Sequence, residues 1–231
     1  MSEPITLTVD GRKISAGPGQ TVLEAAEDAG IYIPHLCFMK GLTPAGSCRV
    51  CTVRINGRAA AACTQPAAAD MFVENDTDEL RRLRRNVIDM LFVEGNHFCM
   101  ICEKSGACEL QALAYRFGIT APKYPYLFPK RSLDASHPSI LIDRNRCVRA
   151  SKELDGKHVF DFVGRGHGKR LAVDAEHGLS GTDAVVTDRA MQACPTGSLL
   201  IKRIGFTVPV GRRRFDCEPI GSDVGKTSAG E

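Results

Sequence analysis

Cysteine is the residue type in this sequence best suited to chemistry. The chain of 231 residues holds ten cysteines, and seven of them fall in two tight groups between Cys37 and Cys108. Cysteines that only pack would be scattered, so this grouping indicates metal binding. The start, Met-Ser-Glu-Pro, has no secretory signal pattern. A reducing cytoplasm keeps thiols free, which argues against a disulfide framework.

The first group has the spacing Cys37-x10-Cys48-x2-Cys51-x11-Cys63. A [2Fe–2S] cluster takes four thiolates, two on each iron, and the small residues before Cys48 would let backbone N–H groups approach the sulfurs. A structural zinc site is the alternative, because four cysteines also suit tetrahedral Zn²⁺. A thioredoxin-type redox pair is disfavoured by the absence of a βαβ setting. We predict that these four cysteines hold a [2Fe–2S] cluster.

The second group consists of His97, Cys99, Cys102 and Cys108. Three thiolates and one imidazole can hold a [4Fe–4S] cluster, and the neutral imidazole should raise its reduction potential by removing one negative charge. The alternative for His97 is a histidine that supports a ligand or caps a helix, with water or another group completing the site. We predict that His97 is a ligand.

Two further cysteines, Cys147 and Cys194, stand apart in the last third of the chain, and Cys217 follows near its end. Two thiolates cannot hold a stable cubane without other ligands, and isolated cysteines often behave as small buried apolar residues. Cys147 and Cys194 are therefore possible remnants of a third site, and a second [4Fe–4S] cluster is doubtful.

The first 75 residues read as a small mixed domain. Residues 5–9 alternate as a strand, Asp10-Gly11 is a hairpin turn signal, and Asn56-Gly57 marks a second hairpin. Thr21 and Glu24 form a capping box for a helix that Gly30 ends. Residues 71–73 add a further short strand.

Residues 76–120 read as helical. Asp76 and Glu79 form a second capping box, and residues 109–117 form a second helix. An apolar stripe recurs at helical spacing, through Leu80, Leu83, Val87, Met90 and Leu91. Four arginines lie mostly off that stripe and predict a solvated face, or else a docking face for an acidic partner: Arg81, Arg82, Arg84 and Arg85.

Beyond residue 120 the chain first becomes irregular and rich in Pro and Tyr, as a connector. A strand near 140–142, a helix after Cys147, a strand over 158–163 and a helix before Cys194 then form a third unit. The predicted domains are 1–75, 76–120 and 121–215, followed by a loose polar tail over 216–231.

Composition excludes several function classes. The net charge of +3 is too weak to indicate nucleic-acid binding, and no run of 18 apolar residues predicts a membrane span. The segment from Gly164 to Lys169 lacks the phosphate-loop spacing. No Gly-x-Gly-x-x-Gly follows a strand, so the chain is not expected to bind NAD or flavin itself.

A family resemblance rests on the ordered strands, the phrase Ile33-Pro34-His35-Leu36-Cys37 and the pair Cys48-Arg-Val-Cys51. These resemble the [2Fe–2S] ferredoxin-like domain that opens the large iron–sulfur subunit of respiratory complex I, [FeFe] hydrogenases and some formate dehydrogenases. The segment around His97 looks most like the diaphorase gamma subunit of NAD-reducing or bidirectional [NiFe] hydrogenases. That subunit carries the short His-x-Cys spacing, where other relatives have three residues between the two ligands.

The resemblance implies an α+β protein: an N-terminal β-grasp [2Fe–2S] domain, a small helical His-Cys₃ [4Fe–4S] domain, and a degenerate ferredoxin-like unit. Relatives usually carry a Cys-x2-Cys-x2-Cys triplet near Cys147, and this chain lacks two of those cysteines. The implied function is an electron relay in a cytoplasmic hetero-oligomer, with no substrate site of its own. Its implied partners are an NAD/FMN-binding diaphorase subunit and a hydrogenase small subunit.

Two rival functions remain open at this point. One is the equivalent relay subunit of complex I or of an NAD-dependent formate dehydrogenase. Complex I's subunit normally continues into a long further region, whereas this sequence ends at Glu231. The other is a zinc-stabilised interaction module without a redox role.

Overall fold

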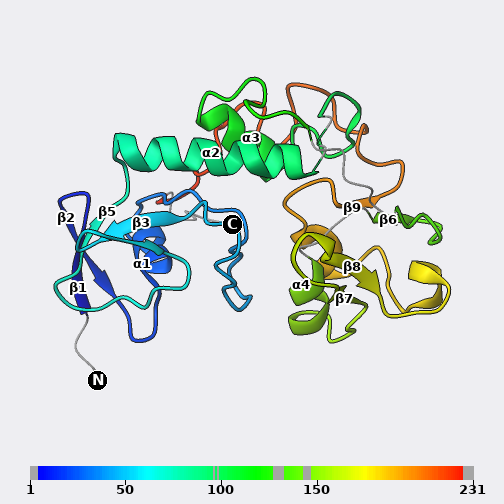
Figure 1. Cartoon of the computed structure of the whole chain (residues 1–231), viewed down its shortest axis with the longest axis horizontal. Coiled ribbons are helices and arrows are strands. Elements are labelled where there is room, and N and C mark those ends of the chain that lie inside the picture. The colour runs from blue at the N-terminus through cyan, green and yellow to red at the C-terminus, as the bar shows by residue number, and fades with distance from the viewer. Residues whose placement is uncertain (1–4, 96, 98, 127–132, 143–146, 226–231) are drawn as a thin grey trace.

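The structure is a computed structural model that describes residues 5–95, 97, 99–126, 133–142 and 147–225. In Figure 1 the N-terminal sheet and the C-terminal unit form two lobes, and the long helix α2 (Asp78–Gly95) runs above the N-terminal lobe toward the C-terminal unit. Part of the predicted connector, the residues at 143–146 before Cys147, and 226–231 lie outside the described residues.

The N-terminal lobe is a five-stranded mixed sheet in the order β2-β1-β5-β3-β4. Its strands are β1 (Ile5–Val9), β2 (Arg12–Ala16), β3 (Thr52–Ile55), β4 (Arg58–Ala61) and β5 (Phe72–Glu74). Strand β5 pairs parallel with β1 and antiparallel with β3. Helix α1 (Val22–Asp28) packs on this sheet, and the predicted Thr21–Glu24 capping box is present. The expected β-grasp arrangement is confirmed.

The helical region consists of α2, a short turn η1 (Cys99–Ile101) and α3 (Glu109–Arg116). The predicted capping box of Asp76 and Glu79 is wrong. Thr77 caps α2, because its Oγ1 accepts the backbone N–H of Leu80 at 3.3 Å. Asp76 binds Arg81 instead, and Glu79 binds Arg54.

The buried face of α2 is also rotated from the predicted stripe. Its buried side chains include Leu80, Arg84, Ile88, Phe92 and Val93. Met90, predicted on the apolar face, is half exposed. The solvated-face prediction is therefore wrong for Arg84, although Arg81, Arg82 and Arg85 are exposed.

The C-terminal unit holds two small antiparallel sheets and two short helices. One sheet pairs β6 (Ile140–Ile142) with β9 (Leu199–Ile201), and the other pairs β7 (Phe160–Val163) with β8 (Arg170–Val173). Helices α4 (Cys147–Glu153) and α5 (Arg189–Ala193) lie where the sequence predicted them. The short turn η2 (Gly166–Gly168) joins β7 to β8, and η3 (Gly178–Gly181) lies between β8 and α5. Strands β8 and β9 were not predicted.

Three buried cores meet at the loop over residues 36–50. Phe38 belongs to the core of the N-terminal sheet, and Leu36 and Val50 belong to the core under α2 and α3. Leu42 belongs to the core of the C-terminal unit. The predicted domain boundaries remain predictions, but this one loop packs into all three parts.

The described residues of the predicted tail, 216–225, contact other parts of the chain. Arg116 donates to the Ile220 carbonyl at 2.9 Å, and Phe215, just before the tail, donates its backbone N–H to the Gly106 carbonyl at 2.9 Å. The Cα of Gly225 lies against Gly30 at the end of α1. The segment to residue 225 therefore folds back onto the N-terminal lobe.

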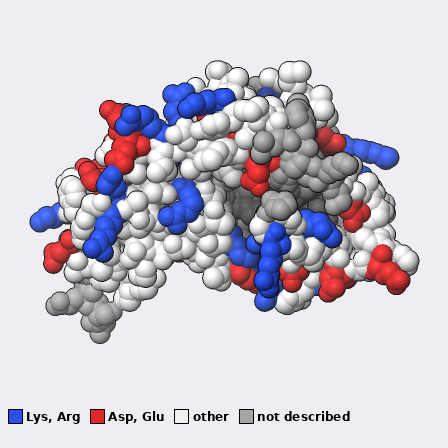
Figure 2. Space-filling view, in the orientation of Figure 1, with Lys and Arg blue, Asp and Glu red and all other residues white. Residues whose placement is uncertain are grey.

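No helix in the described part of the chain is long and apolar enough to span a bilayer. On the face shown in Figure 2, the basic and acidic side chains of the described residues are interspersed.

Candidate metal centres

The structure brings the four cysteines of the first group together. The Sγ of Cys37 is hydrogen-bonded to those of Cys48 and Cys63, and the Sγ of Cys63 is also hydrogen-bonded to that of Cys51. Cys37, Cys51 and Cys63 are buried, and Cys48 is half-buried. The backbone N–H of Cys37 points at the Cys48 sulfur at 3.4 Å.

The hairpin of β3 and β4 sets half of this geometry. Thr52 pairs with Ala61, so Cys51 and Cys63 flank the open ends of the two strands. The N–H of Ala62 donates to the Cys51 carbonyl at 3.1 Å and extends the ladder by one bond. Cys37 and Cys48 come from the two ends of the loop that contacts all three cores.

The four thiols share protons unevenly. Hydrogen bonds from Cys48 and Cys63 lower the pKa of Cys37, and a bond from Cys63 lowers the pKa of Cys51 to about 7. The same bonds, with burial, raise the pKa values of Cys48 and Cys63. Two sulfurs therefore take negative charge readily, as metal-binding thiolates must.

Within the described residues, no group of three or more His, Cys, Asp or Glu side chains is arranged to hold a single metal ion. The sulfur contacts in the first group form one chain, from Cys48 through Cys37 and Cys63 to Cys51. Four cysteines gathered in this way supply the donor set of a two-iron cluster, in which each iron takes two thiolates.

Arg84 is the charged residue most closely associated with the first group. It reaches from α2 and donates to the carbonyls of Val50 (3.2 Å) and Thr52 (3.0 Å), on either side of Cys51. It also donates to the backbone and side-chain carbonyls of Asn75, each at 2.8 Å. Burial lowers the pKa of Arg84 to about 10, so it stays protonated at neutral pH.

The second group lines one small cavity of about 30 Å³ beneath α2 and at the start of α3. His97, Cys99, Cys102 and Cys108 all face it. Burial raises the pKa of Cys108 to about 12, and the backbone N–H groups at the start of α3 offset part of that effect. The sequence-predicted ligands are therefore brought together, and three thiols with an imidazole suit a [4Fe–4S] cluster.

Two glycines make room at this cavity. A Cβ on Gly95 would lie 2.0 Å from the Nε2 of His97, and a Cβ on Gly197 would lie 2.7 Å from the Sγ of Cys102. The imidazole of His97 thus folds back into the space that a side chain at position 95 would occupy. Sequence reasoning singled out neither role, because both depend on contacts across a turn or between distant segments.

Gln111 was also missed. It is buried on α3, lines the cavity and donates a hydrogen bond to the Cys99 sulfur. Its Oε1 accepts the N–H of Gly106 at 2.7 Å, which fixes the loop between Cys102 and Cys108. Gln111 therefore links two ligand segments.

Cys147 and Cys194 come together in the core of the C-terminal unit. Both are buried, and a hydrogen bond from Cys147 lowers the pKa of Cys194 to about 6. Cys217 is exposed and donates to the Gly211 carbonyl, away from this pair. The doubtful third cluster remains a sequence prediction.

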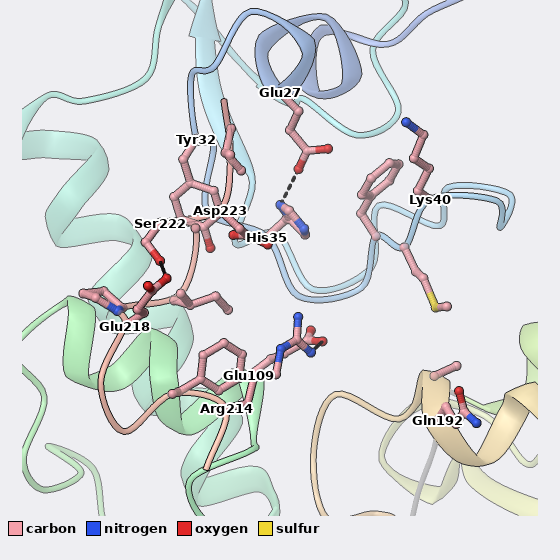
Figure 3. A pocket seen from close by; sticks show the side chains of 18 of the residues that line it. Glu27, Tyr32, His35, Lys40, Glu109, Gln192, Arg214, Glu218, Ser222 and Asp223 are labelled. Atoms are coloured by element: carbon pink, nitrogen blue, oxygen red, sulfur yellow. Dashed lines mark hydrogen bonds and ion pairs between the residues drawn. The ribbon is translucent and has the colours of Figure 1, made fainter. Parts of the chain in front are cut away.

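A larger cavity of about 580 Å³ lies between the cysteine groups. Its walls include His35 near Cys37, Glu109 next to Cys108, and Gln192 near Cys194. Figure 3 shows the C-terminal segment closing one side with Glu218, Ser222 and Asp223, while His35 faces Glu27 at 3.5 Å. The packed tail therefore shapes a space that the sequence did not predict.

Comparison with known proteins matches both cysteine groups to iron–sulfur modules. Residues 2–78 match a family described as a 2Fe-2S iron–sulfur cluster binding domain. Residues 84–123 match the NADH-ubiquinone oxidoreductase-G iron–sulfur binding region. The fold and the sites define an iron–sulfur protein with a [2Fe–2S] domain followed by a [4Fe–4S] binding region.

Similarity extends along nearly the whole chain. The NAD-reducing hydrogenase HoxS subunit gamma of Cupriavidus necator is 36% identical over 94% of this chain and 95% of its own length. A chain in the crystal structure of an NAD⁺-reducing [NiFe]-hydrogenase in the H₂-reduced state is 48% identical. It superimposes with a TM-score of 0.89 over 93% of this chain and 94% of that one. This protein belongs to the gamma-subunit family of NAD-reducing hydrogenases and is a subunit of an oxidoreductase.

More distant relatives are longer proteins. The NADPH-Fe(3+) oxidoreductase subunit alpha of Geobacter sulfurreducens is 31% identical over 87% of this chain, which spans 24% of that protein. The NADH-ubiquinone oxidoreductase 78 kDa subunit of Candida albicans is 28% identical over 87% of this chain and 29% of its own length.

Proposed function

We propose that this chain carries electrons between an NAD(H)-oxidising flavoprotein subunit and the small subunit of a [NiFe] hydrogenase, in a cytoplasmic hetero-oligomer. The observation that carries the proposal is the joining of two cysteine groups by one buried core. Cys48 of the first group, and Cys99 and Cys108 of the second, all pack against the core formed by Leu36, Val50, Ile88 and their neighbours.

In this proposal Cys37, Cys48, Cys51 and Cys63 hold the [2Fe–2S] cluster, and His97, Cys99, Cys102 and Cys108 hold the [4Fe–4S] cluster. The clusters supply one-electron chemistry, and the chain supplies position, burial and hydrogen bonds. The N–H of Cys37 and the side chain of Gln111 donate to ligand sulfurs, and such bonds stabilise negative charge on a reduced cluster.

The partner assignment rests on the relatives. The matched crystal structure is that of an NAD⁺-reducing [NiFe]-hydrogenase, and the similarity covers 94% of the matched chain there. The relative from Cupriavidus necator is the gamma subunit of such a hydrogenase. Electrons would enter from the flavoprotein that exchanges hydride with NAD and leave toward the hydrogenase module.

The test is metal analysis and EPR of the reduced protein, purified without air. Two clusters predict about six irons and about six acid-labile sulfides per chain, and two distinct EPR signals. Cys51→Ser should remove only the [2Fe–2S] signal, and Cys102→Ser only the [4Fe–4S] signal. Cys217→Ser, at an exposed cysteine outside both groups, is the matched control and should keep both.

A colourless protein with zinc and no sulfide would refute the relay and favour the zinc-stabilised module. About ten irons per chain would instead show a third cluster at Cys147 and Cys194, with ligands from elsewhere. Co-purification with the flavoprotein and hydrogenase subunits, expressed together, tests the partner assignment.

A further inference from the structure

Arg84 is an unusual residue for a helix that the sequence reads as amphipathic. It is 1% exposed, although its neighbours Arg82 and Arg85 lie on the surface. A buried guanidinium normally pairs with a carboxylate, because an unbalanced charge in the interior is costly.

No carboxylate pairs with Arg84 within the described residues. All four of its hydrogen bonds go to carbonyl oxygens, and none of the ion pairs found there includes it. The nearest acidic groups are engaged elsewhere. Asp76 holds Arg81, and the carboxylate of Asp10 accepts backbone N–H groups of Asn75 and Asp76.

Asp76 and Asp10 act on Arg84 only through space, and the first cysteine group is a further source of negative charge beside it. Arg84 donates hydrogen bonds to the carbonyls of Val50 and Thr52, the residues on either side of Cys51. The negative charge of Cys51 is among those that stabilise the guanidinium. A [2Fe–2S] cluster on four thiolates has a net charge of about −2 when oxidised and about −3 when reduced. A fixed buried cation beside it favours the more negative state.

We propose that Arg84 is the buried counter-charge of the [2Fe–2S] cluster and raises its reduction potential. This inference rests on the proposed ligation of that cluster by Cys51 and its three partners. Arg84 acts as a positioning residue in addition, since its two bonds fix the backbone on both sides of Cys51. Because α2 continues to the second site, one helix carries the charge for the first cluster and ends at the second.

The experiment is an EPR-monitored redox titration of the full chain and of three variants. Arg84→Gln removes the charge and keeps an amide donor for the carbonyls. Arg84→Lys keeps the charge. Arg85→Gln removes an equal charge from the adjacent, exposed position and is the matched control. Iron and sulfide counts on the wild type come first, because a missing [2Fe–2S] cluster there would refute the proposed function itself.

We expect Arg84→Gln to make the midpoint potential of the [2Fe–2S] signal more negative, with a smaller change in the [4Fe–4S] signal. Arg84→Lys should stay closer to the wild type, and Arg85→Gln should match it. The difference between Arg84→Gln and wild type should persist at high salt, because buried charges are poorly screened.

An unchanged [2Fe–2S] potential in Arg84→Gln would overturn the proposal. If Arg84→Gln loses the cluster while Arg84→Lys keeps it near the wild-type potential, the counter-charge is supported. If both lose the cluster and Arg85→Gln keeps it, Arg84 is a structural tie only and the proposal is wrong.

Discussion

Replacing Gly95 with alanine tests whether His97 holds the second cluster. The added Cβ would lie 2.0 Å from the His97 Nε2, whereas a comfortable carbon–nitrogen contact is about 3.5 Å. The imidazole must therefore move by about 1.5 Å, and metal–ligand distances tolerate only about 0.2 Å. We expect Gly95→Ala to lose the histidine ligand.

The backbone offers no competing explanation. Gly95 ends helix α2 with an ordinary helical conformation, and alanine is favoured over glycine in a helix by about 1 kcal/mol. Gly168→Ala is the matched control, because a Cβ there meets nothing within 4 Å and the backbone is not left-handed. It should behave as wild type.

The assay is iron analysis with EPR of the reduced protein. Gly95→Ala and His97→Ala should both weaken or remove the [4Fe–4S] signal, and the double variant should be no worse than either, since both remove one ligand. The [2Fe–2S] signal should stay intact and serves as the internal reference. A Gly95→Ala protein with wild-type iron content and an unchanged [4Fe–4S] signal would refute the assignment of His97.

Three further predictions concern tuning and stability. Gln111→Leu leaves the N–H of Gly106 without its acceptor at 2.7 Å and the Cys99 sulfur without its donor. The first loss should lower the free energy of unfolding by ~1–3 kcal/mol, measured as a lower urea midpoint. The second should make the reduction potential of the [4Fe–4S] cluster more negative. Burial raises the pKa of Glu27, so the folded state binds the proton more tightly than the unfolded state, and stability falls as pH rises through that raised pKa. Glu27→Gln should therefore gain stability relative to wild type as the pH rises from below 4.5, the ordinary pKa of a glutamate, and a constant difference in urea midpoints from about pH 4 to about pH 8 would contradict this. Gly221→Ala places a Cβ 2.5 Å from the Tyr32 ring and should release the C-terminal segment to protease, whereas Gly211→Ala, equally left-handed but in open space, should not; equal cleavage of both would show that the ring contact does not hold the segment.

Local signals in the sequence determined much of the fold. The Thr21–Glu24 box and the Asp10-Gly11 and Asn56-Gly57 turns depend on residues within four positions of one another, and the structure contains each of them. The cysteine spacing likewise predicted which thiols would gather, because metal binding requires thiolates in sets.

Only the tertiary structure decided which side of α2 is buried. Leu83 and Arg84 are neighbours, and hydropathy favours burying the leucine. The carbonyls of Val50, Thr52 and Asn75 instead provide four acceptors for a guanidinium. Val50 and Thr52 are distant from α2 in the sequence, and Asn75 precedes the helix. The packing of the tail and the space that Gly95 and Gly197 leave at the second site also depend on tertiary contacts. The sequence alone determined the residues that can bind metal; the tertiary contacts decided which charges and glycines surround them, because those contacts join segments that no local pattern links.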